Sequence, residues 1–463
     1  MVTDMTQGKP IRQVMKFFVP LMCSTLFQQL YNVTDSMVVG KFVSKNALAA
    51  VGCTGTLNWL LISFIIGFAS GEGVLVAQAF GRKDEKYMHR CIANGIYVVA
   101  AVAFVITFFS ALFAKDILLF LNTPADILND AYIYILIIIL GYPVSVANNY
   151  VGTLIRAVGD GKNEMVRGII STFVNVVLDL VFVLVLHMGV AGAAIATVIA
   201  NIVNFVIALI YYFKKYPELH VKKQDFKWDW QIIKRTIGIG LPMGLQSSIT
   251  MIGCTLIQSA VNSLGTNYVA AFTTGTKVES LLTTPVQTLT SATTPFIAQN
   301  FGAAKPKRIY TCMRQVGGIC AIYGIVVGML FAFTGKYMAL MYINSYETET
   351  LSLLAFYSKF SGMCLILLCM LYFIRNTVQA LGYSAFAAVG GGIELLTRAL
   401  IAFFLLGPLG YTAICLSNPL SWLFTGTFLF IAFFKVIYKR LRRMEKQERR
   451  ADERIPEKMP VEV

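Results

Sequence analysis

The sequence predicts an all-α polytopic membrane protein, with about twelve transmembrane helices arranged as two six-helix lobes around a central cavity. Composition, long apolar runs and an internal repeat predict this fold class. Of the 463 residues, 57% are hydrophobic and only 14% are charged, with a mean hydropathy of +0.67. A soluble protein cannot bury so much apolar surface. A membrane β-barrel is excluded, because its strands alternate polar and apolar residues.

The apolar runs predict the individual helices. Runs such as 96–114, 131–151 and 316–333 are long enough to cross a hydrocarbon core of about 30 Å at about 1.5 Å per residue. Several runs are interrupted by Gly or Pro. In chain order, the predicted helices span 13–42, 47–80, 88–115, 127–157, 164–187, 190–214, 230–263, 268–302, 308–334, 350–382, 384–406 and 409–438.

The two halves of the chain repeat one another. The segment Val76–Gly81 returns as Ile297–Gly302, 221 positions later, and Pro20 is matched by Pro242. Six helices per half is an even number, so both halves begin and end on the same side as parallel repeats. The predicted domains are an N-lobe at 10–215, a cytoplasmic linker at 216–231, a C-lobe at 232–438 and a basic cytoplasmic tail at 439–463.

The net charge of +15 is unevenly distributed along the chain. Most of the 39 Lys and Arg residues fall in the N-terminus, in alternate loops and in the tail. This positive-inside pattern predicts a multi-pass protein of the inner (plasma) membrane with both termini in the cytoplasm. Nucleic acid is excluded as a partner, because no domain remains outside the membrane to bind it. The nine Cys are scattered without a CxxC pair, which excludes a disulfide framework or a zinc site.

Three predicted helices of the N-lobe each carry a polar stripe. Helical spacing of i, i+4 or i+7 places the members of each stripe on one face, and Tyr31 lies on an adjoining stripe. The stripes are Gln28, Asn32 and Asp35 in the first helix, Asn175 and Asp179 in the fifth, and Thr197, Asn201 and Asn204 in the sixth. Amide and hydroxyl side chains of this kind also tie helices together, at about 0.6–2 kcal/mol each.

The two carboxylates of these stripes indicate ion coupling. An acid in the hydrocarbon region is costly, and we expect no basic residue in the helices that carry Asp35 and Asp179. Two carboxylates that share a cavity cannot both ionise cheaply, so either one takes up a proton or both bind a cation. The sequence therefore predicts a site for H⁺, or for Na⁺ held by Asp35 and Asp179.

The C-lobe carries a different set of charges. Asn175 maps onto Glu394 and Asp179 onto Arg398, so this acid has a partner of opposite sign at i+4 and is expected to stay ionised. Lys277 and Glu279 are expected to compensate each other or a neighbour. The titrating site is therefore predicted in the N-lobe alone. The predicted substrate cavity comprises Gln28, Asn32, Asn201, Gln246, Thr250, Glu279, Glu394 and Arg398.

Three further features each allow two interpretations. Pro20 and Pro242 occupy equivalent places in their helices and either act as hinges or form static kinks. Glu72, in Gly71–Gly73, either contributes to the cavity or pairs with a Lys or Arg of a loop. Arg375 either attracts an anionic group or extends toward the cytoplasmic face, and we favour the second interpretation.

These residues together resemble the multidrug and toxic compound extrusion (MATE) family, in particular its DinF-like branch. The resemblance covers about residues 10–438 and is carried by the motifs named above. It implies a cation-coupled antiporter that exports amphipathic, often cationic, organic compounds. By motif position it assigns Asp35, Asn175, Asp179 and Thr197 to a cation site of the N-lobe, with Tyr31 lining that site and Pro20 bending the first helix. Carboxylates found in the seventh and tenth helices of another branch are absent here.

The predicted function is secondary active efflux by alternating access, in exchange for H⁺ or Na⁺. The chain lacks a Walker A sequence and an HExxH motif, and its three His are far apart, so we expect neither an ATPase nor an enzyme. A flippase for lipid-linked oligosaccharides or lipids is the alternative, although its cavity should be more cationic. The repeat argues against a channel. We expect small organic cations and the lipid bilayer as partners, no cofactor, and a monomer.

Overall fold

The computed structural model describes residues 3–42, 45–120, 123–341 and 347–453, without the side chains of 30–48, 56, 120, 341 and 449–453. All secondary structure in these ranges is helical. Among the described residues, eight helices are long and apolar enough to cross a membrane, or ten if each of two bent helix pairs is one span. The helices α1 and α9 are of similar length, at 33 and 37 residues, and less apolar than most of these eight. The architecture matches the predicted all-α polytopic fold.

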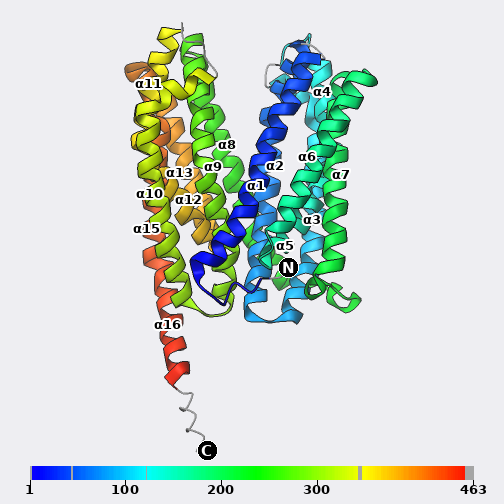
Figure 1. Cartoon of the computed structure of the whole chain (residues 1–463), viewed down its shortest axis with the longest axis vertical. Coiled ribbons are helices and arrows are strands. Elements are labelled where there is room, and N and C mark those ends of the chain that lie inside the picture. The colour runs from blue at the N-terminus through cyan, green and yellow to red at the C-terminus, as the bar shows by residue number, and fades with distance from the viewer. Residues whose placement is uncertain (1–2, 43–44, 121–122, 342–346, 454–463) are drawn as a thin grey trace, which may run out of the picture.

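The N-lobe lies on one side of the bundle in Figure 1. Its helices pack around one hydrophobic core that is rich in Val, Ile and Ala and runs from Ala50 to Leu219, and Ile232, Ile233 and Ala298 of the C-lobe join it. The N-lobe elements are α1 (Pro10–Phe42), α2 (Lys45–Arg82), α3 (Glu85–Phe120), α4 (Leu128–Leu140), α5 (Tyr142–Ala157), α6 (Lys162–Asp179), the π-helix η1 (Leu180–Val185) and α7 (Gly189–Lys215).

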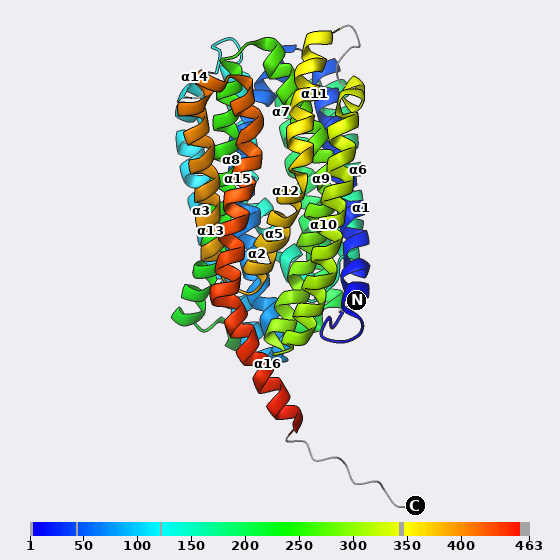
Figure 2. The ribbon, with the colours of Figure 1, turned by 90° about the vertical axis from the view of Figure 1, so that its left-hand side faces the viewer.

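The C-lobe forms the other side of the bundle, and Figure 2 shows it face on. The short 3-10 helices η2 (Pro217–Leu219) and η3 (Lys223–Phe226) connect it to α7. Its elements are α8 (Trp230–Asn262), α9 (Thr266–Gly302), α10 (Pro306–Met338), η4 (Ala339–Met341), α11 (Thr348–Met363), α12 (Leu365–Ala380), α13 (Ser384–Leu400), the π-helix η5 (Ile401–Leu405), α14 (Leu406–Leu409), α15 (Tyr411–Ala432), the π-helix η6 (Phe433–Ile437) and α16 (Tyr438–Glu453).

The two lobes share irregularities in their helices as well as sequence motifs. The predicted single helices 127–157 and 350–382 are each broken, because α4 and α5 meet at 44° and α11 and α12 at 48°. A π-helix follows α6 directly after Asp179, and another begins three residues after Arg398, the position equivalent to Asp179. Both breaks, and the π-helices η1 and η5, therefore occur at similar places in the two lobes, whereas η6 of the C-lobe has no counterpart among the described helices of the N-lobe.

The helix α1 belongs to both lobes. Val14 and Phe17 of α1, together with Met5 before it, are buried in the hydrophobic core of the C-lobe, and α1 also packs against α6 of the N-lobe. Figure 1 shows α1 crossing from beneath one lobe to the other. Pro20 in α1 and Pro242 in α8 both lie inside continuous helices, so neither proline ends its helix.

Candidate functional site

The N-lobe places two of the predicted polar side chains deep in the bundle. Asn175 is 1% exposed and Asp179 is fully buried, and the i, i+4 spacing puts both on one face of α6. No hydrogen-bond partner of the Asn175 amide lies within the described part of the chain. The π-helix that begins at Leu180 interrupts the regular helix at Asp179, and such irregularities are frequent at functional sites.

The neighbouring helix α7 places a polar side chain, Thr197, at the level of Asn175. The Ser171 hydroxyl donates to the Ala200 carbonyl at 3.0 Å and fixes the register of the antiparallel pair α6 and α7. One turn further along α6 is Asn175, and one turn back along α7 is the half-buried Thr197. The structure therefore brings Asn175 and Thr197 to one level, whereas the half-buried Asn201 lies a turn nearer to the two chain ends.

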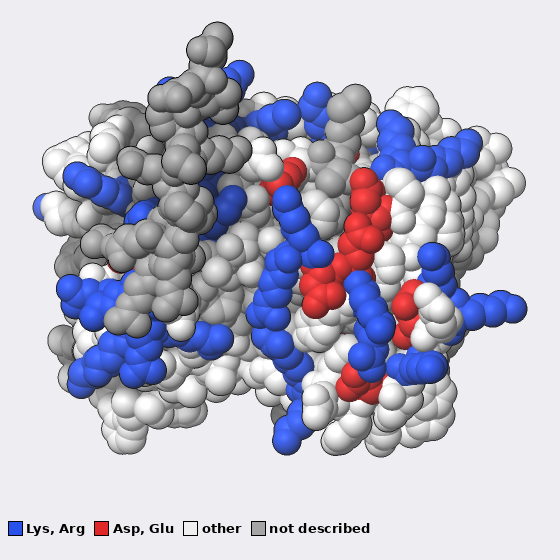
Figure 3. Space-filling view, turned by 90° about the horizontal axis from the view of Figure 1, so that it is seen from below, with Lys and Arg blue, Asp and Glu red and all other residues white. Residues whose placement is uncertain are grey.

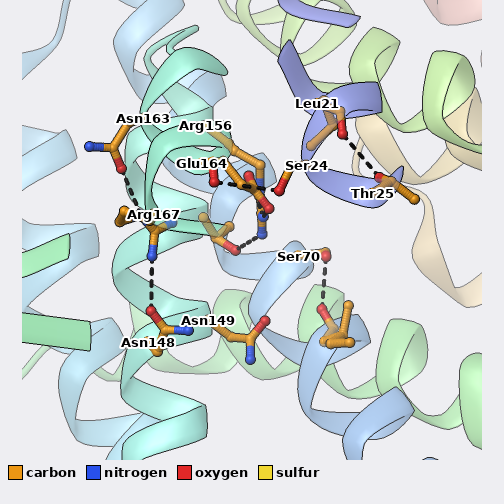
Figure 4. Close-up of polar contacts among 12 residues, drawn as sticks. Leu21, Ser24, Thr25, Ser70, Asn148, Asn149, Arg156, Asn163, Glu164 and Arg167 are labelled. Carbon is orange, nitrogen blue, oxygen red and sulfur yellow. Dashed lines mark hydrogen bonds and ion pairs between the residues drawn. The ribbon is translucent and has the colours of Figure 1, made fainter. Parts of the chain in front are cut away.

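The predicted residues of α1 are only partly described. The side chains of Tyr31, Asn32 and Asp35 lie outside the described residues, although the helix backbone continues through them. The Ser24 hydroxyl donates to the Glu164 carbonyl at 3.4 Å and sets the register between the parallel helices α1 and α6 (Figure 4). Because both helices rise by the same distance per residue, position 35 of α1 lies at the level of positions 175–179 of α6. Gln28, one turn before Asn32, is exposed.

A buried arginine in α6 was missed by the sequence analysis. The Arg167 side chain is 4% exposed and donates to Asn163 Oδ1 at 2.7 Å and to Asn148 Oδ1 at 2.9 Å (Figure 4). It also donates to Asn204 Oδ1 at 2.8 Å. The expectation that Asp179 has no basic residue in its helix is therefore wrong. Twelve residues separate the two, about 18 Å along the axis, so Arg167 is too distant to form an ion pair with Asp179.

The C-lobe acids are matched by cations and hydroxyl groups. Glu394 is 2% exposed and forms ion pairs with Arg375 and, at 3.3 Å, with Arg398. The predicted i, i+4 pair is thus present. The prediction that Arg375 extends toward the cytoplasmic face is wrong, because this side chain is 8% exposed and bonded to Glu394.

The remaining predicted residues of the C-lobe hydrogen-bond to neighbouring helices. Glu279 is buried and accepts hydrogen bonds from Tyr357, at 2.8 Å, and from Ser361. Gln246 donates to Thr250 at 3.1 Å and accepts from Gln379 of α12 at 3.3 Å. The described contacts of Glu279 are therefore to α11, and those of Gln246 join α8 to α12.

The two lobes meet along a seam near the end of the bundle that holds both chain ends, which we call the termini face (Figure 1). Here α2 lies directly against α8. A Cβ atom added to Gly71 would lie 2.5 Å from the Gly240 Cα, and one added to Gly67 would lie 2.6 Å from the Met243 carbonyl oxygen. These contacts require glycine, because any side chain would push the two helices apart.

The repeated Gln-x-Phe-Gly segments close this seam reciprocally. A Cβ on Gly81 would lie 1.9 Å from the Gln299 carbonyl oxygen, and one on Gly302 would lie 1.9 Å from that of Gln78. Gln78 donates to the Ala380 carbonyl at 3.1 Å, and Gln299 donates to the Ala157 carbonyl at 2.7 Å. Each glutamine thus binds the last residue of α12 or α5 in the opposite lobe.

The N-terminal strap, Thr3–Gly8, crosses the same seam. Its Thr3 amide donates to the Val158 carbonyl of the N-lobe at 2.9 Å. Its Met5 amide donates to the Gln299 side chain of the C-lobe at 2.9 Å. Arg308 of α10 holds the strap further, with donations to the Gly8 carbonyl at 2.7 Å and the Met5 carbonyl at 3.0 Å. The strap therefore bonds to both lobes.

The termini face is strongly basic. Figure 3 shows Lys and Arg side chains spread over both lobes with fewer acidic side chains among them. Some acidic side chains of this face form ion pairs, such as Asp229 with Arg90 at 2.6 Å. Exposed cations of this face include Lys9, Lys16, Lys86, Lys222 and Lys307.

Comparisons with known proteins agree with this geometry. The family model MatE matches the chain over residues 20–181 and 242–404, one match in each lobe. The probable multidrug resistance protein YpnP of Bacillus subtilis (strain 168) is 27% identical over 447 residues, which cover 93% of this chain and 96% of that protein. The probable multidrug resistance protein NorM of Thermotoga maritima is 22% identical, over 69% of each chain.

A solved structure shares the same fold. It is an outward-facing conformation of a multidrug resistance MATE family transporter of the MOP superfamily, which superimposes with a TM-score of 0.85 at 19% identity. The match covers 95% of this chain and 98% of that one.

Proposed function

Because this chain belongs to the MatE family of transporters, we propose that it is a secondary active antiporter that exports amphipathic organic cations in exchange for H⁺ or Na⁺. The chain is a membrane transporter and not an enzyme. The multidrug resistance named in its relatives supports efflux of organic compounds as the direction and class of transport.

The proposed orientation places the termini face in the cytoplasm. The Lys and Arg side chains of this face, together with the basic α16, satisfy the positive-inside rule for a protein of the plasma membrane. Substrate then enters from the cytoplasm or the inner leaflet once the seam between the lobes separates. In the conformation described here the seam is closed by Gly71, Gly81 and Gly302, so substrate would leave on the opposite side.

One contrast between the lobes carries the assignment of the coupling site. The C-lobe acid Glu394 is bonded to two arginines, and Glu279 to two hydroxyl groups. In the N-lobe, α6 buries Asn175 and Asp179 at the level that position 35 of α1 reaches, and the Asn175 amide has no hydrogen-bond partner among the described residues. We therefore place H⁺ or Na⁺ binding at Asp35, Asn175, Asp179 and Thr197, with Tyr31 lining the site.

The flippase alternative receives less support. A cavity for a lipid-linked pyrophosphate needs available cations, and the guanidinium groups of Arg375 and Arg398 are both bonded to Glu394. We keep Gln28, Asn32, Asn201, Gln246 and Thr250 as proposed contacts of an organic cation.

Dye uptake into everted membrane vesicles tests this proposal. A fluorescent organic cation should accumulate when either a pH gradient or a Na⁺ gradient is imposed. Asp35→Asn and Asp179→Asn should each lower the driven flux at least about tenfold, the effect of losing about 1.4 kcal/mol of coupling. The matched control is Glu164→Gln, because this acid lies on α6 but is paired with Arg156 at 2.7 Å. If neither gradient changed the dye flux of the wild-type protein, antiport would be ruled out.

A further inference from the structure

Glu72 of α2 is a buried acid that the proposed coupling site does not use. Its side chain is fully buried, and neither carboxyl oxygen has a hydrogen-bond partner within the described part of the chain. The interpretation that it pairs with a loop Lys or Arg is therefore wrong. Its neighbours Gly71 and Gly73 allow α2 to lie close to α8 and to α5. A Cβ atom added to Gly71 would lie 2.5 Å from Gly240 Cα of α8, and one added to Gly73 would lie 2.2 Å from Thr153 Cγ2 of α5.

The surroundings of Glu72 come from both lobes. On the N-lobe side, a Cβ on Gly95 of α3 would lie 3.0 Å from both carboxyl oxygens and 2.6 Å from the Tyr150 hydroxyl. The Tyr150 proton is already donated to the Ile92 carbonyl at 2.7 Å. On the C-lobe side, the fully buried Thr236 of α8 faces the carboxyl group, and its own hydroxyl forms no hydrogen bond within the described residues.

Few charged groups face this position. The titratable neighbours are Cys91 of α3 and Tyr150 of α5, both buried and both neutral in their ordinary forms. Two cations in this region, Arg82 at the end of α2 and Arg235 of α8, are exposed and act on Cys91. An ionised carboxylate here would lack a counter-charge and would have the Thr236 hydroxyl as its facing hydrogen-bond donor. Burying such a charge still costs several kcal/mol, whereas the protonated acid avoids this cost.

We propose that Glu72 is a second proton-binding site, which holds its proton while the seam between the lobes is closed and releases it to cytoplasmic water when the seam opens. The proton leaves the carboxyl oxygen as α8 moves away from α2 and water replaces Thr236. This inference rests on the proposed alternating access. One such proton changes the ratio of open to closed molecules by at most about tenfold per pH unit, with alkaline pH favouring the open seam.

Distances between the lobes test the proposal without substrate. Spin labels at Lys86→Cys of α3 and Lys307→Cys of α10, two exposed positions in different lobes, report the opening of the seam when Cys254, the exposed native cysteine, is replaced by Ser. The long-distance population of the otherwise wild-type protein in nanodiscs should grow as the pH is raised. Glu72→Gln should remain closed at every pH. Thr236→Val, which retains the carboxyl group, should still respond to pH.

Two results would overturn the proposal: a pH response of Glu72→Gln equal to that of the otherwise wild-type protein, or the absence of a response in both. Infrared spectroscopy gives a second measurement on the same samples. A carbonyl band of a protonated carboxyl group should disappear on alkaline titration, be missing in Glu72→Gln and persist in Glu164→Gln. Neither measurement needs a transport gradient. A failure of dye antiport would therefore refute the proposed function, and these spectra would still decide the protonation of Glu72.

Discussion

At the scale of single residues, Asp160 stabilises the start of α6. Its carboxylate accepts hydrogen bonds from the Lys162 amide at 2.9 Å, the Asn163 amide at 3.2 Å and the Tyr216 hydroxyl at 2.8 Å. Burial raises the pKa of Asp160, and hydrogen bonds, among them those from Tyr216 and the Asn163 amide, lower it, so that on balance the pKa lies below its usual value of 3.8. This side chain therefore caps the helix that carries Asn175 and Asp179.

Asp160→Ala should lower the free energy of unfolding by about 0.5–2 kcal/mol at neutral pH, since it removes this cap. A lowered folded-state pKa means that the carboxylate contribution is complete above 3.8 and is lost as the pH falls through the folded-state value. The difference from wild type should therefore shrink in strong acid. Thermal unfolding in detergent measures it. Lys162→Ala is the control, because its side chain is exposed and its amide is retained.

Replacement of Glu394 should also lower the stability of the protein. Glu394→Gln leaves Arg375 and Arg398 buried without their counter-charge, and breaking a buried ion pair in this way costs about 3–5 kcal/mol. The unfolding midpoint in detergent should fall clearly below that of Asp116→Asn, which changes an exposed acid. An unchanged midpoint would contradict the ion-pair geometry.

The pairing of Glu394 with Arg398 could be predicted from the sequence, because the i, i+4 spacing lies within one helix. The partners that Arg167 and Arg375 find on other helices could not. Asn163 lies four residues before Arg167 on α6, but Asn148 of α5 and Asn204 of α7 converge on Arg167 only through the packing of the helices. Hydropathy places such residues in a membrane helix but does not say which face of a neighbouring helix they meet.

At the scale of the helices, the close contact of α2 with α9 depends on Gly81. Gly81→Ala would bring a methyl group to within 1.9 Å of the Gln299 carbonyl oxygen, so the two helices must move apart. We expect a loss of about 1–3 kcal/mol in the free energy of unfolding, as for overpacked cores. The population with a separated seam, measured by the spin labels at positions 86 and 307, should also increase.

The control for Gly81→Ala is Gly55→Ala on the same helix, where nothing lies within 4 Å of the added atom. That change should leave both measurements unchanged or stabilise α2 slightly, because alanine favours helix more than glycine does. Equal effects of the two substitutions would show that the seam does not depend on this contact.

The breaks within helices were less predictable than the helices themselves. Long apolar runs identified 127–157 and 350–382 as spans, but the bends near Gly141 and Cys364 leave no mark in hydropathy. Gly141 has an ordinary helical φ of −78°, so its sequence position alone does not predict a bend. The matching π-helices after α6 and α13 likewise depend on packing.

At the scale of the whole molecule, the N-terminal strap links the two lobes through Arg308. Arg308→Ala removes the donations to the carbonyls of Met5, Gln7 and Gly8 and should release the strap. Hydrogen exchange at the Met5 amide should become at least about tenfold faster, which corresponds to a loss of about 1.4 kcal/mol. Arg314→Ala, an exposed position on the same helix, serves as control. Unchanged exchange in Arg308→Ala would mean that the strap is held by its other contacts.

The arrangement of two lobes followed from the repeat in the sequence, whereas the way they touch did not. The repeat shows that Gln78 and Gln299 are equivalent, but it does not say that each binds the opposite lobe. That contact depends on how the lobes are rotated relative to each other. Asp35, Asn175, Asp179 and Thr197 were predicted from spacing and resemblance, and Asp35 lies among the side chains outside the described residues, so its role stays a prediction.

The reciprocal contacts of Gln78 and Gln299 also bear on how the chain arose. If both lobes descend from one six-helix chain, Gly81 and Gly302 were once the same residue in two identical copies, as were Ala157 and Ala380. A symmetric pair of such copies could form the same contacts twice around a two-fold axis, as isologous dimers do. Gene fusion would then have freed the two copies to diverge, with carboxylates kept in one and ion pairs acquired in the other.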